Sequence, residues 1–121
     1  MLDRAYGALV GGAIGDAMGM PASFLTRAQI EKSYGYIHEF LKPEKDVQSY
    51  HGNLQAAEIT DDTMESVIIS DILISDGEFT EMAFNRAMKK WAVEQKMLES
   101  TVIGPSTRRY LTALIEGRDP K

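Results

Sequence analysis

Residues 60–63 read Thr-Asp-Asp-Thr and stand directly before an apolar run, so two carboxylates lie between two hydroxyl groups. One interpretation is structural, because Thr and Asp oxygens accept the free amide hydrogens of a first helical turn. Asp62 and Glu65 would then form a reciprocal cap. One aspartate is enough for a cap, however, and two concentrate the oxygen ligands that Mg²⁺ and Mn²⁺ prefer. The segment predicts a helix start and, as a second role, a divalent-cation site at Thr60, Asp61 and Asp62.

A second polar segment, "GPSTRRYL" at residues 104–111, has the residue types of another helix start. Proline suits the first helical position, and serine and threonine are common near a cap. The same arrangement leaves backbone amides unpaired at a helix N-terminus, where a phosphate group can bind. The ordinary helix start is the favoured interpretation, and Arg108 and Arg109 are either solvated or placed to meet an anion.

Residues 7–21, "GALVGGAIGDAMGMP", predict a helix that ends near Gly19, because Pro21 disfavours helical geometry in the residue before it. Glycines recur at four-residue steps along one stripe of this helix, and each costs roughly 1 kcal/mol against alanine. Close approach of another helix along the stripe would compensate this cost. A phosphate-binding loop is much less favoured, since the segment follows no strand and lacks the Lys-Ser/Thr pair of such loops.

Asp16 is the one charged residue of this glycine-rich segment. On a largely apolar helix, such a side chain faces water, caps the backbone of a neighbouring element or supports a polar site. We expect it to lie near a polar cleft formed by Thr60, Asp61 and Asp62 and away from the outer surface.

The remaining periodicity is helical, and no segment predicts a strand. Thr26 with Gln29 has capping-box spacing, and Thr80 can cap a further helix. The helix that begins at residue 62 carries a wide apolar face, so we expect it to be buried on most sides. Residues 36–58 have no clear period and predict a long loop. The expected helices after the first one cover residues 26–35, 62–75, 80–91 and 104–117.

Both histidines, His38 and His51, lie in the long loop. Loops of this length are uncommon inside a compact domain and are often functional. Neither histidine has a partner at metal-ligand spacing, however, so the sequence predicts ordinary surface or loop positions and no catalytic role for them.

The composition excludes several classes of function. The absence of cysteine excludes disulfides, zinc–thiolate sites and thiol nucleophiles. A net charge of −5 without a basic run argues against a nucleic-acid partner. The longest weakly polar stretch, residues 5–21, contains five glycines and an aspartate, and it is shorter than the roughly 20 residues that a spanning helix needs. We expect a cytoplasmic protein without a membrane partner.

Taken together and in this order, the segments at residues 7–21, 59–63 and 104–111 resemble the ADP-ribosylglycohydrolase family, which includes the dinitrogenase reductase-activating glycohydrolases. The resemblance implies an all-α fold, an orthogonal helical bundle of about five helices. Residues 1–121 would form one partial domain that corresponds to the N-terminal part of the family domain.

The metal site that the resemblance implies is incomplete in this sequence. Family members bind a pair of divalent ions, Mg²⁺ or Mn²⁺, through a Thr-Asp-Asp triplet, which Thr60, Asp61 and Asp62 match. The second ligand group of the family is a later Asp-x-Asp-Thr motif, which these 121 residues do not contain. Ser23 also stands where family members with ADP-ribosyl hydrolase activity usually carry a glutamate. We therefore expect the chain alone to be weakly active or inactive.

The reaction that the resemblance implies is metal-dependent hydrolysis of an N- or O-glycosidic bond to ADP-ribose or a related ribosyl group. Asp61 or Asp62 would act in catalysis. The residues implied to bind the substrate are Asp16, Gly104, Ser106 and Thr107. Two other functions stay open: a helical interaction module that self-associates through exposed apolar helix faces, and a catalytically inactive relative that binds a ribosyl ligand.

Overall fold

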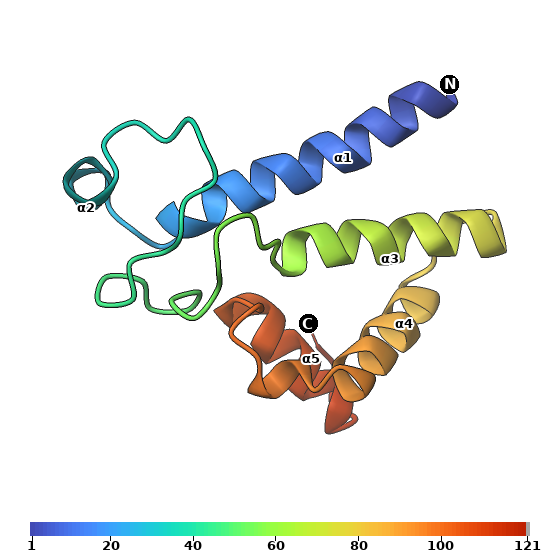
Figure 1. The fold of residues 1–121 in the computed structure, drawn as a ribbon. Coiled ribbons are helices and arrows are strands. Elements are labelled where there is room, and N and C mark those ends of the chain that lie inside the picture. Colours follow the sequence, from blue (N-terminus) through green and yellow to red (C-terminus); the bar gives the residue numbers. More distant parts are fainter. Residues whose placement is uncertain (121) are drawn as a thin grey trace.

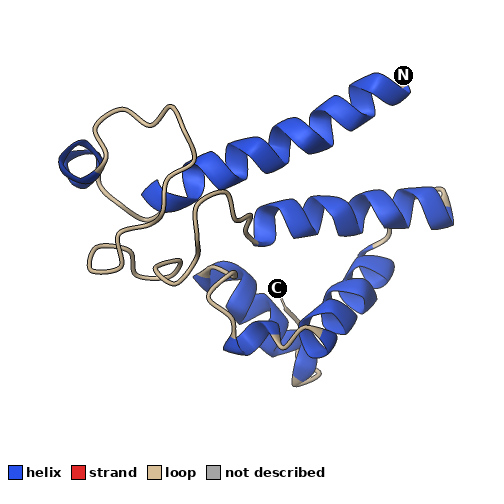
Figure 2. Cartoon of the chain, in the orientation of Figure 1, coloured by secondary structure: helices blue, strands red, loops and turns tan. Residues whose placement is uncertain are grey.

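The computed structural model describes residues 1–120, and within them the chain forms five α-helices and no strand (Figure 1). The expected all-α fold of five helices is therefore confirmed. Figure 2 shows that loops connect all of these helices and that the longest loop precedes α3. The helices are α1 (Leu2–Gly19), α2 (Arg27–Ser33), α3 (Asp61–Asp76), α4 (Glu81–Glu94) and α5 (Pro105–Ile115), with short 3₁₀ turns at Met20–Ala22 and Met97–Glu99.

The helices form two groups that share α3. α1 and α3 lie side by side and run in opposite directions, so the end of α1 adjoins the start of α3 (Figure 1). α4 folds back beneath α3, and α5 packs against α4. This topology brings the starts of α3 and α5 to the same end of the molecule, next to the end of α1.

Local capping residues set the starts of α2 and α4, as the sequence predicts. Thr26 and Gln29 form the reciprocal capping box of α2. The Thr80 hydroxyl accepts a hydrogen bond from the amide of Ala83 in the first turn of α4. α3 ends at Gly77, whose φ of 77° is a left-handed conformation that glycine adopts without steric cost.

The core lies between α4, α5 and the segment that connects them. Met88, Ile103 and Leu111 are fully buried, and Ala92 joins them in one cluster. The apolar face that the sequence predicts for α4 is the face that packs here. Partly buried side chains surround this cluster, namely Ile68, Phe84, Trp91, Met97, Leu98, Tyr110 and Leu114. Helix α5 is therefore held rigidly relative to α4, which fixes the position of its N-terminal end.

The expectation that α3 is buried on most sides is wrong for this chain. Asp61 and Ile72 are its only buried residues within the described structure. Val67, Leu73 and Ile74 are exposed, and Ile74 keeps 82% of its surface accessible. The reason is that α1 and α4 are the main helices that pack on α3, so two sides of it stay uncovered.

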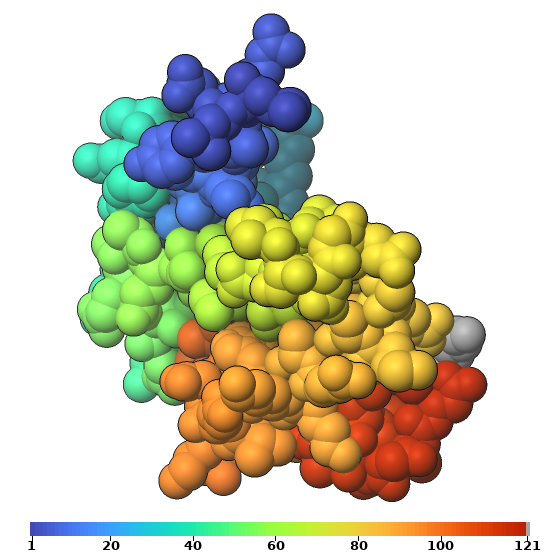
Figure 3. Space-filling model, turned by 90° about the vertical axis from the view of Figure 1, so that its right-hand side faces the viewer, coloured from blue at the N-terminus to red at the C-terminus, as the bar shows by residue number. Residues whose placement is uncertain are grey.

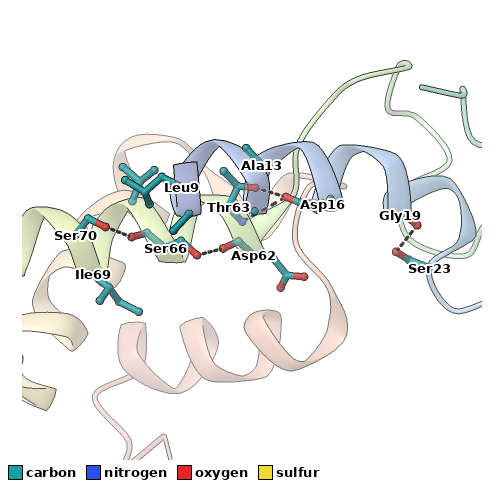
Figure 4. A pocket seen from close by; sticks show the side chains of 14 residues that line it. Leu9, Ala13, Asp16, Gly19, Ser23, Asp62, Thr63, Ser66, Ile69 and Ser70 are labelled. Atoms are coloured by element: carbon teal, nitrogen blue, oxygen red, sulfur yellow. Dashed lines mark hydrogen bonds between the residues drawn. The ribbon is translucent and has the colours of Figure 1, made fainter. Parts of the chain in front are cut away.

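The expected close packing of another helix on the glycine stripe of α1 is also wrong. A Cβ atom built at Gly7, Gly11, Gly15 or Gly19 would meet no atom of the described residues within 4 Å beyond the adjacent backbone of α1 itself. Gly12, Gly15 and Gly19 instead line an open groove of about 660 Å³ between α1 and α3 (Figure 4). The helices meet along this groove without the bare backbone contact that the stripe predicted.

The free space at Gly11 leaves room for a larger residue there. Gly11→Ala should raise the free energy of unfolding by about 0.5–1 kcal/mol, because alanine removes the helix-propensity cost of glycine without a clash. Urea denaturation of the variant and the wild type measures this difference. Gly77→Ala is the matched control and should destabilise, since alanine is strained at a φ of 77°. A loss of stability in Gly11→Ala would mean that the stripe is covered in solution.

Much of the apolar surface of α1 is exposed. Leu2, Tyr6 and Ile14 are all accessible, and Figure 3 shows the first turns of α1 standing out from the rest of the molecule. Within residues 1–120 no single helix is long and apolar enough to cross a membrane, although Leu2–Ala22 and Arg27–Ser33, bent by 90°, pass that test as a pair. Self-association through this surface stays a prediction.

The long loop between α2 and α3 is anchored to the end of α1 by one buried side chain. The Gln48 Nε2 group lies 2.8 Å from the Ser23 carbonyl oxygen and 3.3 Å from that of Pro21, and it donates hydrogen bonds to both. The Gln48 Oε1 atom accepts from the Tyr50 amide. This anchor fixes the loop beside Ser23 and Phe24, and it sets the position of His51.

Candidate functional site

Asp16 joins the end of α1 to the start of α3. Its Oδ2 atom accepts a hydrogen bond from the amide of Thr60 at 2.8 Å. It accepts another from the hydroxyl of Thr63 at 2.5 Å (Figure 4). Its Oδ1 atom accepts from the Thr60 hydroxyl at 2.7 Å, and the Thr63 amide donates a longer bond of 3.3 Å. Of the alternatives for Asp16, capping a neighbouring element is the one that the structure shows.

The cap of α3 differs from the reciprocal pair predicted for Asp62 and Glu65. Thr60 is the N-cap residue, and its hydroxyl accepts from the Asp62 amide while it donates to Asp16. Glu65 faces α5 instead and accepts a hydrogen bond from the Thr107 hydroxyl at 3.2 Å. The sequence prediction was wrong because the capping carboxylate comes from another helix, which sequence spacing does not reveal.

Asp61 connects the start of α3 to the start of α5. Its side chain is buried, and its Oδ2 atom accepts a hydrogen bond from the Gly104 amide at 3.2 Å. The two residues are 43 positions apart in the sequence. Since the Gly104 amide already has this partner, it is not a free donor for a phosphate group, and the ordinary helix start is the better description of residues 104–107.

Neither arginine is placed to meet an anion at this helix start. Arg108 donates hydrogen bonds to the carbonyl oxygens of Leu98 and Ser100, at 2.9 Å for the latter. Arg109 is exposed and contacts Ser106. Arg108 therefore supports the segment that leads into α5, and Arg109 lies at the surface.

A cavity of about 220 Å³ brings most of the predicted site residues together. The cavity lies between the starts of α3 and α5, and its walls also come from the residues that follow the 3₁₀ turn after α1 and from the long loop. Asp62 and Ser23 line both this cavity and the groove between α1 and α3, so the two spaces adjoin. The residues that line the cavity are Ser23, Phe24, His51, Thr60, Asp61, Asp62, Gly104, Pro105, Ser106 and Thr107. Asp16 lies behind its wall and reaches it through Thr60.

The Asp62 carboxylate points away from the contact between Asp16 and Thr63 (Figure 4). Its pKa is raised above the ordinary value, because its partial removal from water and the negative charges of Asp61 and Asp16 all disfavour ionisation, while His51 acts in the opposite direction. No described residue donates a hydrogen bond to this carboxylate. A cation bound beside it would relieve the repulsion among the acidic groups.

The donor atoms at this end of α3 fit a hard divalent cation in their chemistry, since they are carboxylate and hydroxyl oxygens. Asp61, Asp62 and the Thr60 hydroxyl would hold such an ion, with water in the remaining positions. Across residues 1–120, however, no group of three or more histidine and acidic side chains is arranged to hold a metal ion. The described residues therefore offer part of a coordination shell and no more.

Glu65 is a further acidic residue of the site that sequence analysis did not select. It is half-buried beneath the start of α5. Burial raises its pKa, the charges of Asp61 and Asp62 raise it further, and the hydrogen bond from Thr107 opposes them. Folding therefore favours the protonated form of Glu65.

This raised pKa gives a pH-dependent prediction. Above its folded-state pKa, the ionised Glu65 side chain destabilises the folded protein, whereas well below its ordinary pKa of 4.5 it is protonated in both the folded and the unfolded state and this cost is absent. Glu65→Gln removes the charge and keeps an oxygen acceptor for Thr107. The variant should therefore melt about 1–2 °C higher at neutral pH, as expected for a few tenths of a kcal/mol at a half-exposed site.

The gain should shrink as the pH is lowered through the folded-state pKa of Glu65, and calorimetric scans over a pH series measure it. The exposed Glu39 of the long loop provides the control, since Glu39→Gln should change the melting temperature little at any pH. A Glu65→Gln gain that is equal at all pH values would contradict the assigned cause.

The sequence predicted an ordinary surface or loop position for His51, and it did not anticipate that the residue is buried. It lies in the long loop as expected, but only 3% of its surface is exposed, and it lines the cavity beside the two aspartates. Its Nδ1 atom lies 2.7 Å from the Thr101 carbonyl oxygen. No spacing rule reveals this residue, because its hydrogen-bond partner is 50 positions away. His38 remains at the surface, as predicted.

The chain is thus an all-helical protein in which two helix starts converge on paired aspartates, next to the end of a glycine-rich first helix. In comparison with known sequences, the sequence model of the ADP-ribosylglycohydrolase family matches residues 1–121. The chain belongs to the ADP-ribosylglycohydrolase family, and the resemblance seen in its three motifs is confirmed.

Individual relatives agree with this assignment. The uncharacterized protein YegU of Escherichia coli is 32% identical over 118 residues, which cover 96% of this chain and 35% of that protein. ADP-ribosylarginine hydrolase Tri1 of Pseudomonas putida is 34% identical over 90 residues, or 74% of this chain and 21% of the relative. ADP-ribosyl-[dinitrogen reductase] glycohydrolase of Rhodospirillum rubrum is 29% identical over 109 residues, which cover 90% of this chain and 35% of that protein. The chain thus spans about a third or less of the length of these relatives.

Proposed function

We infer that this chain forms one wall of a metal-dependent glycohydrolase site that acts on an N- or O-glycosidic bond to ADP-ribose or a related ribosyl group. The observation that carries the proposal is that the two polar motifs line one cavity. The Gly104 amide donates a hydrogen bond to Asp61, whereas the carboxylate of Asp62 stays open to the cavity. Family membership supports the reaction class, and two relatives are named for hydrolysis of ADP-ribosylated substrates.

The roles of the two aspartates follow from their contacts. Asp61 is fixed by the Gly104 amide and positions the start of α5. Asp62 is open to the cavity, and its raised pKa suits a group that accepts a proton. A Mg²⁺ or Mn²⁺ ion held by Asp61, Asp62 and the Thr60 hydroxyl would anchor ribose hydroxyls and would make a nearby water easier to deprotonate.

The proposed step is a displacement at ribose C1″. The water oxygen forms a bond to C1″ while the bond from C1″ to the leaving nitrogen or oxygen breaks. The proton of the water passes to Asp62, and the leaving atom takes a proton from solvent. The neighbouring negative charges of Asp61 and Asp62 favour the positive charge that develops on the ribose ring in the transition state.

Because position 23 is a serine, the proposal does not specify whether the leaving group is linked through nitrogen or through oxygen. Ser23 stands at the position where an acidic residue is expected from the family pattern, and its hydroxyl donates to the Gly19 carbonyl at 3.4 Å. A serine cannot serve as a carboxylate at this edge of the cavity. The proposal therefore covers both N- and O-linked ribosyl groups.

The test has a binding part and a turnover part. NMR titration with ADP-ribose should show weak binding by the chain in Mg²⁺ or Mn²⁺, and weaker binding in chelator. Release assays on ADP-ribosyl-arginine and ADP-ribosyl-serine peptides should show little or no turnover by the 121 residues alone, since their sequence lacks the second carboxylate motif. A chain that binds no ADP-ribose with or without metal would contradict the proposed function. Robust metal-dependent turnover would support the function and contradict the expected weak activity.

A further inference from the structure

We propose that His51 is a substrate-binding residue whose Nε2 atom accepts a hydrogen bond from a hydroxyl of the ribosyl group. The inference rests on the proposed function, because it places the ribosyl group in the cavity between the starts of α3 and α5. His51 forms part of the wall of this cavity and belongs to none of the three sequence segments that carry the family resemblance.

The tautomer of His51 follows from its one hydrogen bond. A backbone carbonyl oxygen can only accept, so the Nδ1 atom 2.7 Å from the Thr101 oxygen must carry the hydrogen. In the neutral imidazole, the other nitrogen then presents a lone pair and acts as an acceptor. The anchor on Thr101 also fixes the orientation of the ring.

The Nε2 atom is left open for a ligand. Within residues 1–120 the His51 side chain makes no hydrogen bond besides the one to Thr101, and no side-chain nitrogen or oxygen is sealed from solvent without a partner. Nε2 must therefore remain accessible to solvent, although only 3% of the residue surface is exposed. The cavity that His51 lines is the space available for this access.

The surroundings of His51 suit a sugar better than a metal ion. Its ring centroid lies 5.8 Å from that of Phe24, an aromatic side chain that is 56% exposed and also lines the cavity. A sugar ring presents apolar C–H groups to an aromatic ring and O–H donors to acceptors, and this cavity offers both. His51, Asp61 and Asp62 do not form a three-ligand metal site, because no such group exists within the described residues.

Two substitutions separate the anchor of His51 from its proposed contact. In His51→Asn, the amide nitrogen takes the place of Nδ1 and can still donate to Thr101, but nothing reaches the position of Nε2. In His51→Gln, the amide extends to the position of Nε2 and offers an oxygen acceptor there, but the bond to Thr101 is lost. If the role of His51 is purely structural, the variant that is less stable should also bind the ligand more weakly. If His51 contacts the substrate, the more stable variant, His51→Asn, should be the one that binds more weakly.

The experiment measures the melting temperature and the dissociation constant for ADP-ribose, by NMR titration in Mg²⁺, for the wild type and both variants. We expect His51→Asn to melt near the wild type and to bind ADP-ribose about 3- to 10-fold more weakly, as for one lost hydrogen bond. We expect His51→Gln to melt lower and to bind within about 2-fold of the wild type, as an acceptor at the same position should allow.

Each other outcome has a defined meaning. Wild-type affinity in His51→Asn would overturn the inference and leave the proposed function intact. If His51→Asn does not fold, His51→Gln decides, because a 3-fold or larger loss of affinity in that variant while it remains folded would overturn the inference. Absence of ADP-ribose binding by the wild type would contradict the proposed function itself, and with it the inference.

Discussion

Replacing Asp16 by alanine should lower the free energy of unfolding by about 2–4 kcal/mol, because the Asp16 carboxylate accepts four hydrogen bonds from two residues of α3. The loss includes more than a helix cap. The Thr60 amide would stay largely enclosed without a partner, and the contact that fixes the end of α1 beside the start of α3 would disappear. The melting temperature should fall by roughly 10 °C.

Two further variants test the cause of this effect. Asp16→Asn keeps one oxygen acceptor, but it removes the charge and places an NH₂ donor next to the donors of α3. This variant should therefore be destabilised about half as much as the alanine variant. Asp3→Ala removes an exposed acid from the same helix and should change stability by less than about 0.5 kcal/mol. Urea denaturation measures all three. An Asp16→Ala variant as stable as Asp3→Ala would show that the hydrogen bonds contribute nothing in solution.

The helix boundaries could be predicted from the sequence because the groups that set them are local. Thr26 finds its partner three residues later, Thr80 likewise, and the left-handed Gly77 ends α3 where it stands in the chain. Asp16 was identified as unusual by its apolar surroundings, and its proximity to the segment of Thr60, Asp61 and Asp62 was predicted correctly. The sequence could not decide whether Asp16 faces water, caps a neighbouring element or supports a polar site, because its role depends on how α1 and α3 pack.

The features that sequence analysis missed all depend on distant partners. His51 bonds to Thr101 and Glu65 bonds to Thr107, at separations of 50 and 42 residues, and neither pair has a spacing signature. The two incorrect burial expectations have the same origin. A wide apolar face on α3 or a stripe of glycines on α1 shows that a surface can be covered, but the elements that cover it are set by tertiary packing.

The second large effect concerns the proposed cation site. Asp61→Asn should weaken Mn²⁺ binding by at least about 10-fold, the size of change seen even for residues that only support metal ligands. Asparagine has the shape of aspartate, and its Oδ1 atom can still accept the hydrogen bond from the Gly104 amide. The start of α5 should therefore stay in place while one negative charge is removed, so the variant isolates electrostatics from architecture.

Water-proton relaxation in Mn²⁺ solutions measures this affinity, and the melting temperature without metal checks that the fold persists. Asp71→Asn removes an exposed carboxylate from the same helix, outside the cavity, and should bind Mn²⁺ like the wild type. Equal Mn²⁺ affinity in Asp61→Asn and the wild type would mean that the carboxylate only holds α5. In that case the adjacent aspartates would serve as structural links between helices, and the metal-dependent proposal would lose its ligand set.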